Sequence, residues 1–362
     1  MRGLSCVENR KPPFRAEFQS VVQKSAPRKG CQTMNQFTAT KYKIRYQVSK
    51  VVLPNSPSAS SIPFVEYLKW QYFKHFTPKY PFSLDIQTRS GCNARCTFCG
   101  VGREEKKITG VMSDDLFHKI VDEALTFPLL QKINPYLLND PLIDKNIEQR
   151  IEYISRKKNK RRLPLVRLIT NAGLLTEERA YRLLRSGLDE LNLSFHSIMP
   201  EVYEAMMRPL KFDTVMGNIL KLVELRDQLH GAKKPKINVW TVLTKPVEQN
   251  LKNERAYWKK IGVGFVARKL DNRASNTVEA AQLGGRPMYL VQLCPIPFWR
   301  AWVMWNGDMI MCCVDQERTN VLGNCTNRSI REVWNDAAYQ KLRHNWRTHN
   351  LQGLLCNKCK GS

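Results

Sequence analysis

Short apolar segments alternate with amphipathic ones between residues 82 and 270. The apolar segments predict strands at residues 82–86, 133–138, 165–169, 188–195, 236–244 and 264–270. Pro135 weakens the second of these strands, because proline cannot donate to a sheet. The amphipathic segments predict helices at residues 113–125, 144–155, 176–186, 200–206, 212–230 and 251–261. This order predicts an α/β fold with a parallel sheet covered by helices, although periodicity does not separate an open sheet from a barrel.

The pattern changes on both sides of this region. Helical spacing of apolar residues over 63–76 predicts a helix that caps the sheet, and residues 271–290 have the composition of a linker. Residues 299–305 and 308–314 predict a β-hairpin, in which Asn306-Gly307 supplies a type I′ turn. A capping box, Ser329 with Glu332, predicts a helix that continues to about Trp346.

The formal net charge of +26 raises the hypothesis of a nucleic-acid-binding protein. The distribution of charge argues against it, because residues 1–60 hold eleven Lys or Arg and two Glu in a segment with little periodicity. That segment predicts a flexible basic arm. The basic run at residues 156–162 joins a helix to the next strand, and we expect a solvated loop there. No apolar run is long enough to span a bilayer and no signal peptide is recognisable, so a cytoplasmic protein is expected.

The segment after the first predicted strand contains three closely spaced cysteines. Cys92, Cys96 and Cys99 have the spacing C-x3-C-x2-C. Three thiolates lack the fourth ligand of a structural zinc site but suit three irons of a [4Fe-4S] cluster. Half of a zinc site and buried structural cysteines remain alternatives. The position between a strand and a helix is where α/β barrels carry their chemistry.

The sequence Cys-Asn-Ala-Arg-Cys-Thr-Phe-Cys resembles the cluster loop of the radical S-adenosylmethionine (SAM) superfamily, with Phe98 at the aromatic position. The resemblance implies a partial (β/α)6 TIM-like barrel over residues 61–270, and SAM bound to the open iron of the cluster. It also implies a SAM pocket at the strand ends. The residues concerned are Asn139, Asp140, Thr170, Asn171, Ser194 and Arg208.

Each of these pocket residues has a specific expected role. Asn139-Asp140-Pro141 resembles the family's Gly-Gly-Glu-Pro motif without its glycines, and Asp140 would accept hydrogen bonds from the SAM ammonium. Thr170, Asn171 and Ser194 would contact the SAM ribose or carboxylate, and Arg208 would pair with the carboxylate. Thr244, at the end of the fifth strand, is a further candidate for the pocket. For all of these residues, an ordinary cap or turn is the alternative.

Four distant cysteines frame the predicted hairpin and helix, namely Cys294, Cys312, Cys356 and Cys359. This C-terminal module, over residues 291–362, resembles the SPASM/Twitch extension of radical SAM dehydrogenases that act on aminocyclitols. The resemblance implies a second, auxiliary [4Fe-4S] cluster held by all four thiolates. A structural zinc site is the alternative, and Cys325 could replace one ligand.

With both clusters, the resemblance implies a radical SAM oxidoreductase. SAM would be cleaved to a 5′-deoxyadenosyl radical, which takes a hydrogen atom from the substrate, and the auxiliary cluster would accept an electron. The expected reaction is dehydrogenation of a small polyol or amino sugar, or oxidative modification of a peptide. The resemblance implies a reducing partner such as flavodoxin or ferredoxin. We expect no association with a membrane and no binding of nucleic acid.

The catalytic side chain is not fixed by the sequence. Asp308, Asp315 and His196 are candidate bases, and for His196 a structural role is an equal alternative. Cys313 stands where sulfatase-maturing relatives carry an aspartate base, which argues against that activity. Its thiol could instead return a hydrogen atom, as in an epimerase, or it could only pack. An alternative from another class is a basic, zinc-stabilised nucleic-acid-binding protein.

Overall fold

The structure is a computed structural model, and it describes residues 72–73, 75–101, 109–158, 164–231, 234–270, 294 and 296–359. Internal contacts divide the chain into Met1–Val51 and Val52–Ser362, and all described residues belong to the second unit. The predicted basic arm over residues 1–60, most of the predicted helix over 63–76 and the predicted linker over 271–290 lie outside the described residues. None of the helices in the described ranges is long and apolar enough to cross a membrane.

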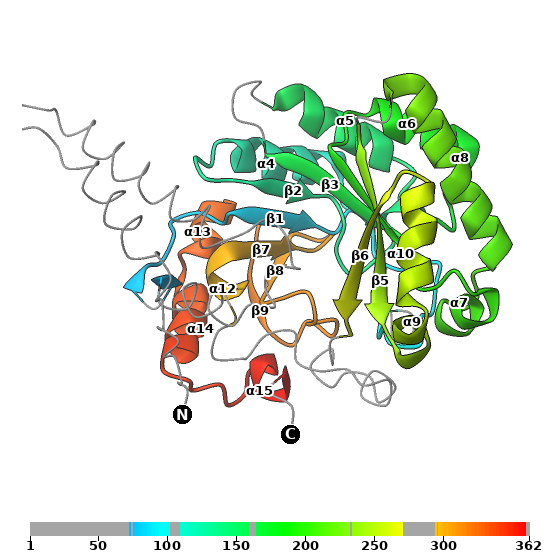
Figure 1. Cartoon of the computed structure of the whole chain (residues 1–362). Coiled ribbons are helices and arrows are strands. Elements are labelled where there is room, and N and C mark those ends of the chain that lie inside the picture. The colour runs from blue at the N-terminus through cyan, green and yellow to red at the C-terminus, as the bar shows by residue number, and fades with distance from the viewer. Residues whose placement is uncertain are drawn as a thin grey trace, which may run out of the picture. The chain divides into compact units, whose positions relative to one another are not determined.

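Six parallel strands form the centre of this unit (Figure 1). They are β1 (Ser83–Ile86), β2 (Lys132–Asn134), β3 (Leu165–Thr170), β4 (Glu190–Ser194), β5 (Lys236–Leu243) and β6 (Gly264–Lys269). Each strand pairs in parallel with the next one along the chain. The strand order has β6 at one edge and does not bring it back to β1 within the described residues. The predicted α/β fold with a partial barrel is confirmed.

The helices that connect these strands lie outside the sheet (Figure 1). They are α4 (Asp114–Leu125), η2 (Pro141–Ile143), α5 (Ile147–Lys157), α6 (Glu177–Arg185), α7 (Pro200–Met206), α8 (Phe212–His230), α9 (Lys245–Gln249) and α10 (Leu251–Lys260). The predicted bounds of α7 and α8 are confirmed.

The predicted elements of the barrel differ most clearly from the structure at three places. β2 ends at Asn134 and does not continue to residue 138, because Pro135 has no N–H to donate. The helix predicted from residue 144 begins at Ile147, since the short 3-10 turn η2 precedes it. The short helix α9 was not predicted, and it directly follows β5.

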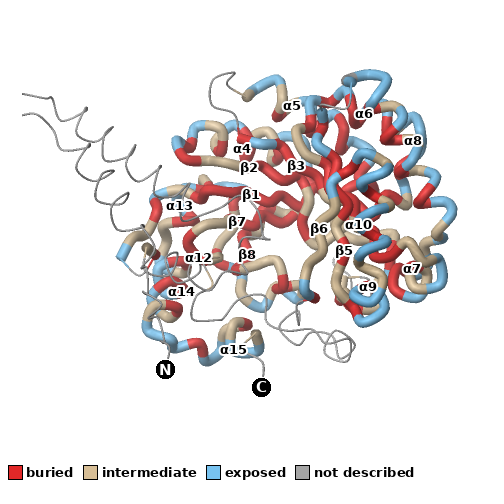
Figure 2. The backbone as a smooth tube through the Cα atoms, viewed as in Figure 1, coloured by how far each residue is buried: buried red, intermediate tan, exposed pale blue. Residues whose placement is uncertain are grey.

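The two faces of the sheet differ in polarity. Leu84, Ile86, Leu191 and Leu193 are completely buried and belong to the apolar core that the strands share with the surrounding helices. Figure 2 shows buried residues concentrated along the central strands. Alternate residues point to opposite faces of a strand, so the residues between them face the inside of the barrel. These inner side chains are largely polar and contact one another across strands: Asn134 bonds to Asp85 and Arg167, and Asn238 donates to Asn192.

The C-terminal module continues the same sheet. It comprises α12 (Ile296–Trp299), β7 (Arg300–Val303), β8 (Asp308–Ile310), β9 (Val321–Asn324), α13 (Ile330–Trp334), α14 (Ala337–Arg347) and α15 (Leu355–Cys359). β7 pairs in parallel with β1, and β8 and β9 follow in antiparallel order. The module is therefore joined to the barrel by a strand ladder.

A hairpin of β7 and β8 is present as predicted, but its strands are shorter than the predicted 299–305 and 308–314, and the predicted type I′ turn was wrong. Gly307, with φ +86°, is the turn residue that has a positive φ, whereas a type I′ turn needs two. The N–H of Gly307 donates to Met304 O (2.9 Å), and Met304 N donates to Asp308 O (2.8 Å). This is the pattern of a three-residue loop in which glycine occupies the left-handed position.

The helix predicted up to Trp346 is divided in two. The capping box of Ser329 and Glu332 opens α13 as predicted, but α13 ends at Trp334 and Asp336 caps α14. Helix α4 of the barrel holds the start of α13, because the Glu123 carboxylate accepts from Ile330 N (2.7 Å) and Arg331 N (2.9 Å).

Candidate active site

The three-cysteine loop follows β1 and is fixed to the end of β2. Gly91 forms a parallel bridge with Asn139, and Asp140 N donates to Gly91 O (3.3 Å). The Asn139 amide donates to Arg89 O (2.8 Å) and accepts from Leu137 N (3.0 Å). Asn139 was predicted to contact SAM, but both the nitrogen and the oxygen of its side-chain amide are used in hydrogen bonds to the backbone.

The loop is also held from the C-terminal end of α7. Thr97 N donates to Met206 O (3.0 Å), Arg95 N donates to Arg208 O, and the sulfur atoms of Cys96 and Met207 are 3.4 Å apart. The Arg208 side chain is exposed, and its backbone carbonyl is the group that contacts the loop. The predicted ion pair between Arg208 and SAM stays a prediction.

The thiols of this loop are half-buried and differ in environment. Burial, and then the nearby Asp140 carboxylate, raise the pKa of the Cys92 thiol to about 12, while Ala94 N donates to its sulfur (3.4 Å). Cys99 N donates to Cys96 O (3.0 Å), which closes the loop into a tight turn. In the described part of the chain, no three Cys, His, Asp or Glu side chains are close enough to hold one metal ion.

The Asp140 carboxylate links the ends of β2 and β3. It is 3% exposed and accepts from Leu142 N (2.9 Å), Asn171 N (2.7 Å) and the Thr170 hydroxyl (2.9 and 3.0 Å to its two oxygens). Burial raises the pKa of Asp140, and the backbone donors of Asn171 and Leu142 oppose that rise. The three donors use most of the acceptor capacity of a carboxylate, so Asp140 positions the strand ends in this structure.

Asn171 extends this network to the cysteine loop. Its amide nitrogen donates to Asn93 Oδ1 (2.8 Å), and its amide oxygen lies 3.4 Å from Asn93 Nδ2 and accepts from Gly173 N (2.8 Å). The same nitrogen is 3.9 Å from the Cys92 sulfur. Asn93 was not predicted, and no sequence signal marks it beyond its place between the first two cysteines.

The other strand-end candidates are His196, Ser194 and Thr244, and His196 contacts the aromatic residue of the loop. Phe98 is buried and packs edge-on against the His196 ring, with ring centroids 5.0 Å apart. The Nδ1 atom of His196 accepts from Val242 N (3.2 Å), an arrangement typical of a structural histidine. Ser194 is half-buried at the end of β4, and Thr244 is buried with its hydroxyl 3.8 Å from Met206 Sδ.

The C-terminal cysteines are neighbours in the structure. Burial first, and then Cys356, Cys359 and Cys313, raise the pKa of the Cys294 thiol. Cys312 is likewise raised in pKa, first by a hydrogen bond with Cys313 and then by burial, with Cys356 also contributing. Each of the four predicted ligands thus lies near enough to another cysteine of the set for their charges to interact, as does Cys313, but no three of them are close enough to hold one metal ion.

Cys325 is separate from this group. It is buried, and the neighbouring charges that affect its pKa are those of Glu123, Lys119, Arg328 and Asp308. These contacts place it against α4, and they do not favour the hypothesis that it replaces a cluster ligand.

The two candidate aspartate bases both accept hydrogen bonds from their own loops. Asp315 is 1% exposed and accepts from Thr319 N (2.8 Å), the Thr319 hydroxyl (2.8 Å) and Asn320 N (2.9 Å). Asp308 accepts from the amides of Asn306 (2.6 Å) and Asn324 (2.8 Å). These contacts stabilise the loop and the hairpin, and they do not favour either carboxylate as the base.

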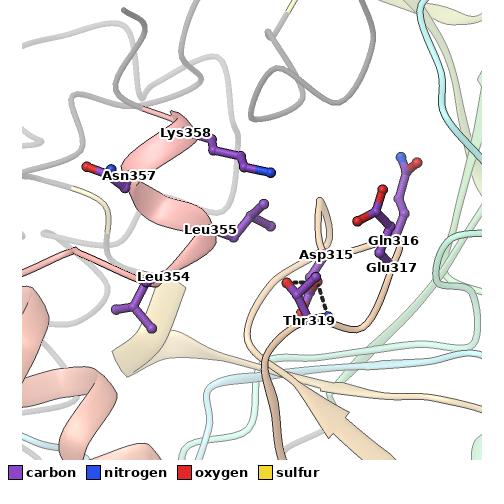
Figure 3. A pocket seen from close by; sticks show the side chains of 9 residues that line it. Asp315, Gln316, Glu317, Thr319, Leu354, Leu355, Asn357 and Lys358 are labelled. Atoms are coloured by element: carbon purple, nitrogen blue, oxygen red, sulfur yellow. Dashed lines mark hydrogen bonds between the residues drawn. The ribbon is translucent and has the colours of Figure 1, made fainter.

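A pocket of about 280 Å³ adjoins the auxiliary cysteines. Figure 3 shows one wall formed by Asp315, Gln316 and Thr319 and the other by Leu355 and Lys358 of α15, the helix that carries two of the cysteines. The Gln316 side chain also reaches the first cysteine loop, since a methyl group added at Gly100 would collide with its amide. The loop that begins at Cys312 thus extends from one cysteine set to the other.

Two family models match the chain. Residues 86–229 match the Radical SAM superfamily, and residues 294–360 match SPASM, an iron-sulfur cluster-binding domain. The chain therefore contains a Radical SAM domain and a C-terminal SPASM domain, as its two cysteine sets predicted. Cysteine thiolates are the donors that the iron-sulfur clusters of such domains require, and both cysteine sets fall at these domains.

Two curated relatives differ in activity. The chain is 21% identical over 281 residues to the S-adenosyl-L-methionine-dependent 2-deoxy-scyllo-inosamine dehydrogenase of Niallia circulans. The aligned region covers 76% of this chain and 91% of the relative. The chain is also 32% identical over 152 residues to the GTP 3′,8-cyclase of Desulforamulus reducens. This aligned region covers 41% of the chain and 44% of that relative. Because one relative is a dehydrogenase and the other a cyclase, these similarities do not define the reaction.

Solved structures of the same fold include enzymes with small and with peptide ligands. BtrN in complex with AdoMet and 2-DOIA aligns with a TM-score of 0.53 and 18% identity, covering 78% of this chain and 92% of BtrN. SuiB of Streptococcus suis, bound to the precursor peptide SuiA, aligns with a TM-score of 0.60 and 14% identity, covering 91% of this chain and 78% of SuiB. At these identities the similarity supports the fold alone.

Proposed function

We propose that the protein is a radical SAM oxidoreductase that removes a hydrogen atom from its substrate and passes an electron to an auxiliary cluster. The observation that carries this proposal is the loop after β8. Cys312 lies near Cys313 and Cys356, whereas Gln316, four residues later, lies against Gly100 beside Cys99. A cluster on each cysteine set would therefore be linked by a short segment of chain.

In this proposal Cys92, Cys96 and Cys99 hold one [4Fe-4S] cluster, and Cys294, Cys312, Cys356 and Cys359 hold the other. The first cluster, when bound with SAM, supplies the electron that splits SAM into methionine and a 5′-deoxyadenosyl radical. The substrate then loses a hydrogen atom, one electron and one proton, which together make a two-electron oxidation. An external donor such as flavodoxin or ferredoxin provides the initial electron.

The side chains at the strand ends have positioning roles in this scheme. Asp140 fixes the ends of β2 and β3, and it accepts a hydrogen bond from Asn171 N. The Asn171 side chain in turn bonds to Asn93 and so positions the cysteine loop. Phe98, within the cysteine loop, packs against His196, and in this scheme the pair keeps water from the loop. Ser194 and Arg208 remain our candidates for contact with SAM.

The test is anaerobic reconstitution with iron and sulfide, followed by iron analysis and reduction in the presence of SAM. We expect about eight irons per chain and formation of 5′-deoxyadenosine. The double variant Cys356→Ala/Cys359→Ala should retain about four irons and still cleave SAM. The matched control is Cys325→Ala, which should keep the full iron content. A wild-type protein that binds zinc instead, or that leaves SAM intact, would refute the proposal.

A second candidate is a radical SAM epimerase in which Cys313 returns a hydrogen atom to the substrate radical. The observation that favours it is the contact of Cys313 with Leu137, Trp302 and Ile310, because this cluster includes inner side chains of the barrel. Turnover in D2O separates the two candidates. An epimerase places solvent deuterium on the carbon that reacts, and it loses this activity in Cys313→Ala, whereas an oxidoreductase releases an oxidised product.

A further inference from the structure

The Gln316 side chain reaches from the C-terminal module to the first cysteine loop, and no step above gives it a chemical role. A methyl group added at Gly100 would overlap with Gln316 Oε1 and lie 3.0 Å from its Cδ and 3.3 Å from its Nε2. Gly100 directly follows Cys99, so the Gln316 amide lies against the end of the loop that carries the third cysteine. The absence of a side chain at Gly100 is what allows this close approach.

Hydrogen bonds within its own loop fix the base of the Gln316 side chain. Asp315 N donates to Cys312 O (3.1 Å), and Gln316 N donates to Val314 O (3.0 Å). The buried Asp315 carboxylate accepts from the N–H and from the hydroxyl of Thr319, each at 2.8 Å. Figure 3 shows the Gln316 side chain extending away from Asp315 and Thr319. These bonds connect the position of Gln316 to that of Cys312, a predicted ligand of the auxiliary cluster.

A second contact holds the C-terminal module near the same cysteine loop. A methyl group added at Gly110 would overlap with the ring of Trp305, which lies directly before the hairpin turn. Gly110 is itself bound to the chain before the first cysteine, because Gly110 N donates to Ser90 Oγ (2.7 Å) and Ser90 N donates to Gly110 O (2.9 Å). The place of Gln316 beside the loop therefore does not depend on a single contact.

The Nε2 atom of Gln316 is a buried donor, and it has no hydrogen-bond partner within the part of the chain that the structure describes. A buried donor is costly unless a bound group accepts its hydrogen bond. The first cysteine has donors from the loop and the barrel, since Ala94 N donates to the Cys92 sulfur (3.4 Å) and Asn171 Nδ2 lies 3.9 Å from it. Gln316 brings a donor from the C-terminal module to the side of the loop where Cys99 lies.

We propose that the Gln316 amide donates a hydrogen bond to a sulfur of the iron-sulfur cluster held by Cys92, Cys96 and Cys99, and that it thereby raises the reduction potential of this cluster. Hydrogen bonds to sulfur are one of the means by which proteins set such potentials. Reduction adds negative charge, and an N–H group directed at sulfur stabilises the more negative state. The inference rests on the proposed function only in placing a cluster on these three cysteines.

This role connects the two domains in a way that cysteine ligation alone does not. The C-terminal module would carry its own cluster and also adjust how easily the first cluster is reduced. Because Gln316 is tied to Cys312 through backbone hydrogen bonds, a change in the auxiliary site would be transmitted to the first loop over four residues.

The test is a redox titration of the reconstituted full-length protein without SAM, followed by EPR spectroscopy. The first cluster is identified as the one whose EPR signal changes when SAM is added. Gln316→Met keeps the length of the side chain but removes its N–H group, so we expect the midpoint potential of the first cluster to fall. Loss of one hydrogen bond to a charged group should change the reduction equilibrium roughly tenfold, which is about 59 mV for one electron.

Three further variants make the test specific. Gln316→Glu replaces the donor with a negative charge and should lower the same potential further. Gln340→Met, the same substitution on α14, removes a donor to Asn335 O (3.2 Å) and is the matched control, which should leave both potentials unchanged. Gly100→Ala displaces the Gln316 amide and should also lower the potential, but it should add little to Gln316→Met, because both changes remove the same hydrogen bond.

Equal potentials of the first cluster in wild type and Gln316→Met would overturn the proposal, as would a shift confined to the auxiliary cluster. Unchanged potentials combined with weaker binding of SAM would also overturn it, because SAM would then be the acceptor. A wild-type protein without a cluster that responds to SAM would contradict both this proposal and the proposed function. A cluster that responds to SAM but whose potential does not depend on Gln316 would contradict this proposal alone.

Discussion

Asp140→Asn tests whether the Asp140 carboxylate organises the strand ends or binds SAM directly. An amide has nearly the same shape but offers one acceptor oxygen, whereas Asp140 accepts from Leu142 N, Asn171 N and the Thr170 hydroxyl. Whichever way the amide is turned, one backbone N–H at this buried position faces an NH2 group. An unsatisfied buried donor costs about 1–3 kcal/mol.

We therefore expect Asp140→Asn to lower the free energy of unfolding by about 2 kcal/mol. The assay is thermal unfolding of the anaerobic protein, where such a loss corresponds to a decrease in Tm of roughly 4 to 8 °C. Thr170→Val removes one donor and keeps the shape, so it should cost about 1 kcal/mol. The two variants share one network, and their combined effect should be smaller than the sum of the separate effects.

SAM binding distinguishes the two roles of Asp140. If the carboxylate only positions the strand ends, Thr170→Val should bind SAM like wild type, and Asp140→Asn should lose affinity in proportion to its loss of stability. An Asp140→Asn protein with wild-type Tm and a tenfold weaker affinity for SAM would refute this reasoning. That result would instead support the direct contact with the SAM ammonium that the sequence predicts.

Two other changes test how the C-terminal module is held against α4 and how the buried Lys132 titrates. Glu123→Ala removes the acceptor of two N–H groups at the start of α13. We expect the Ile330 and Arg331 amides to exchange hydrogen roughly 30-fold faster in this variant. Asp122→Ala, on the same helix, is the control and should leave these exchange rates unchanged. Burial lowers the pKa of Lys132 from 10.5 to about 8, so the unfolded chain binds more protons between these values and the free energy of unfolding rises with pH there. Urea titrations at pH 7 and pH 10 should show this rise, roughly 3 kcal/mol at most, and Lys132→Met should lack it; the same rise in both proteins would contradict the assignment.

Local signals explain which elements were predictable from the sequence. The bounds of α7 and α8 follow from Pro200 at the first helical position and from Gly231, which adopts the left-handed conformation after the last turn. The cysteine spacings were equally local. Each of these features depends on residues close together in the chain.

The parts that could not be predicted depend on contacts between distant residues. Asp140 meets Thr170 and Asn171 across about 30 positions, so its network could not be inferred from the loop in which it lies. The parallel pairing of β7 with β1 joins segments more than 200 residues apart. The contact of Arg167 with Asn134 was missed for the same reason, because it joins side chains 33 positions apart.

Strand β1 connects the regions of the two cysteine sets. Its C-terminal end leads into the first cysteine loop, and its edge pairs with β7 over four residues, from Ser83 to Ile86. β7 is followed by the antiparallel strand β8, after which the chain reaches Cys312. If each set holds a cluster, as we propose, the backbone hydrogen bonds between β1 and β7 would set the separation of the two clusters.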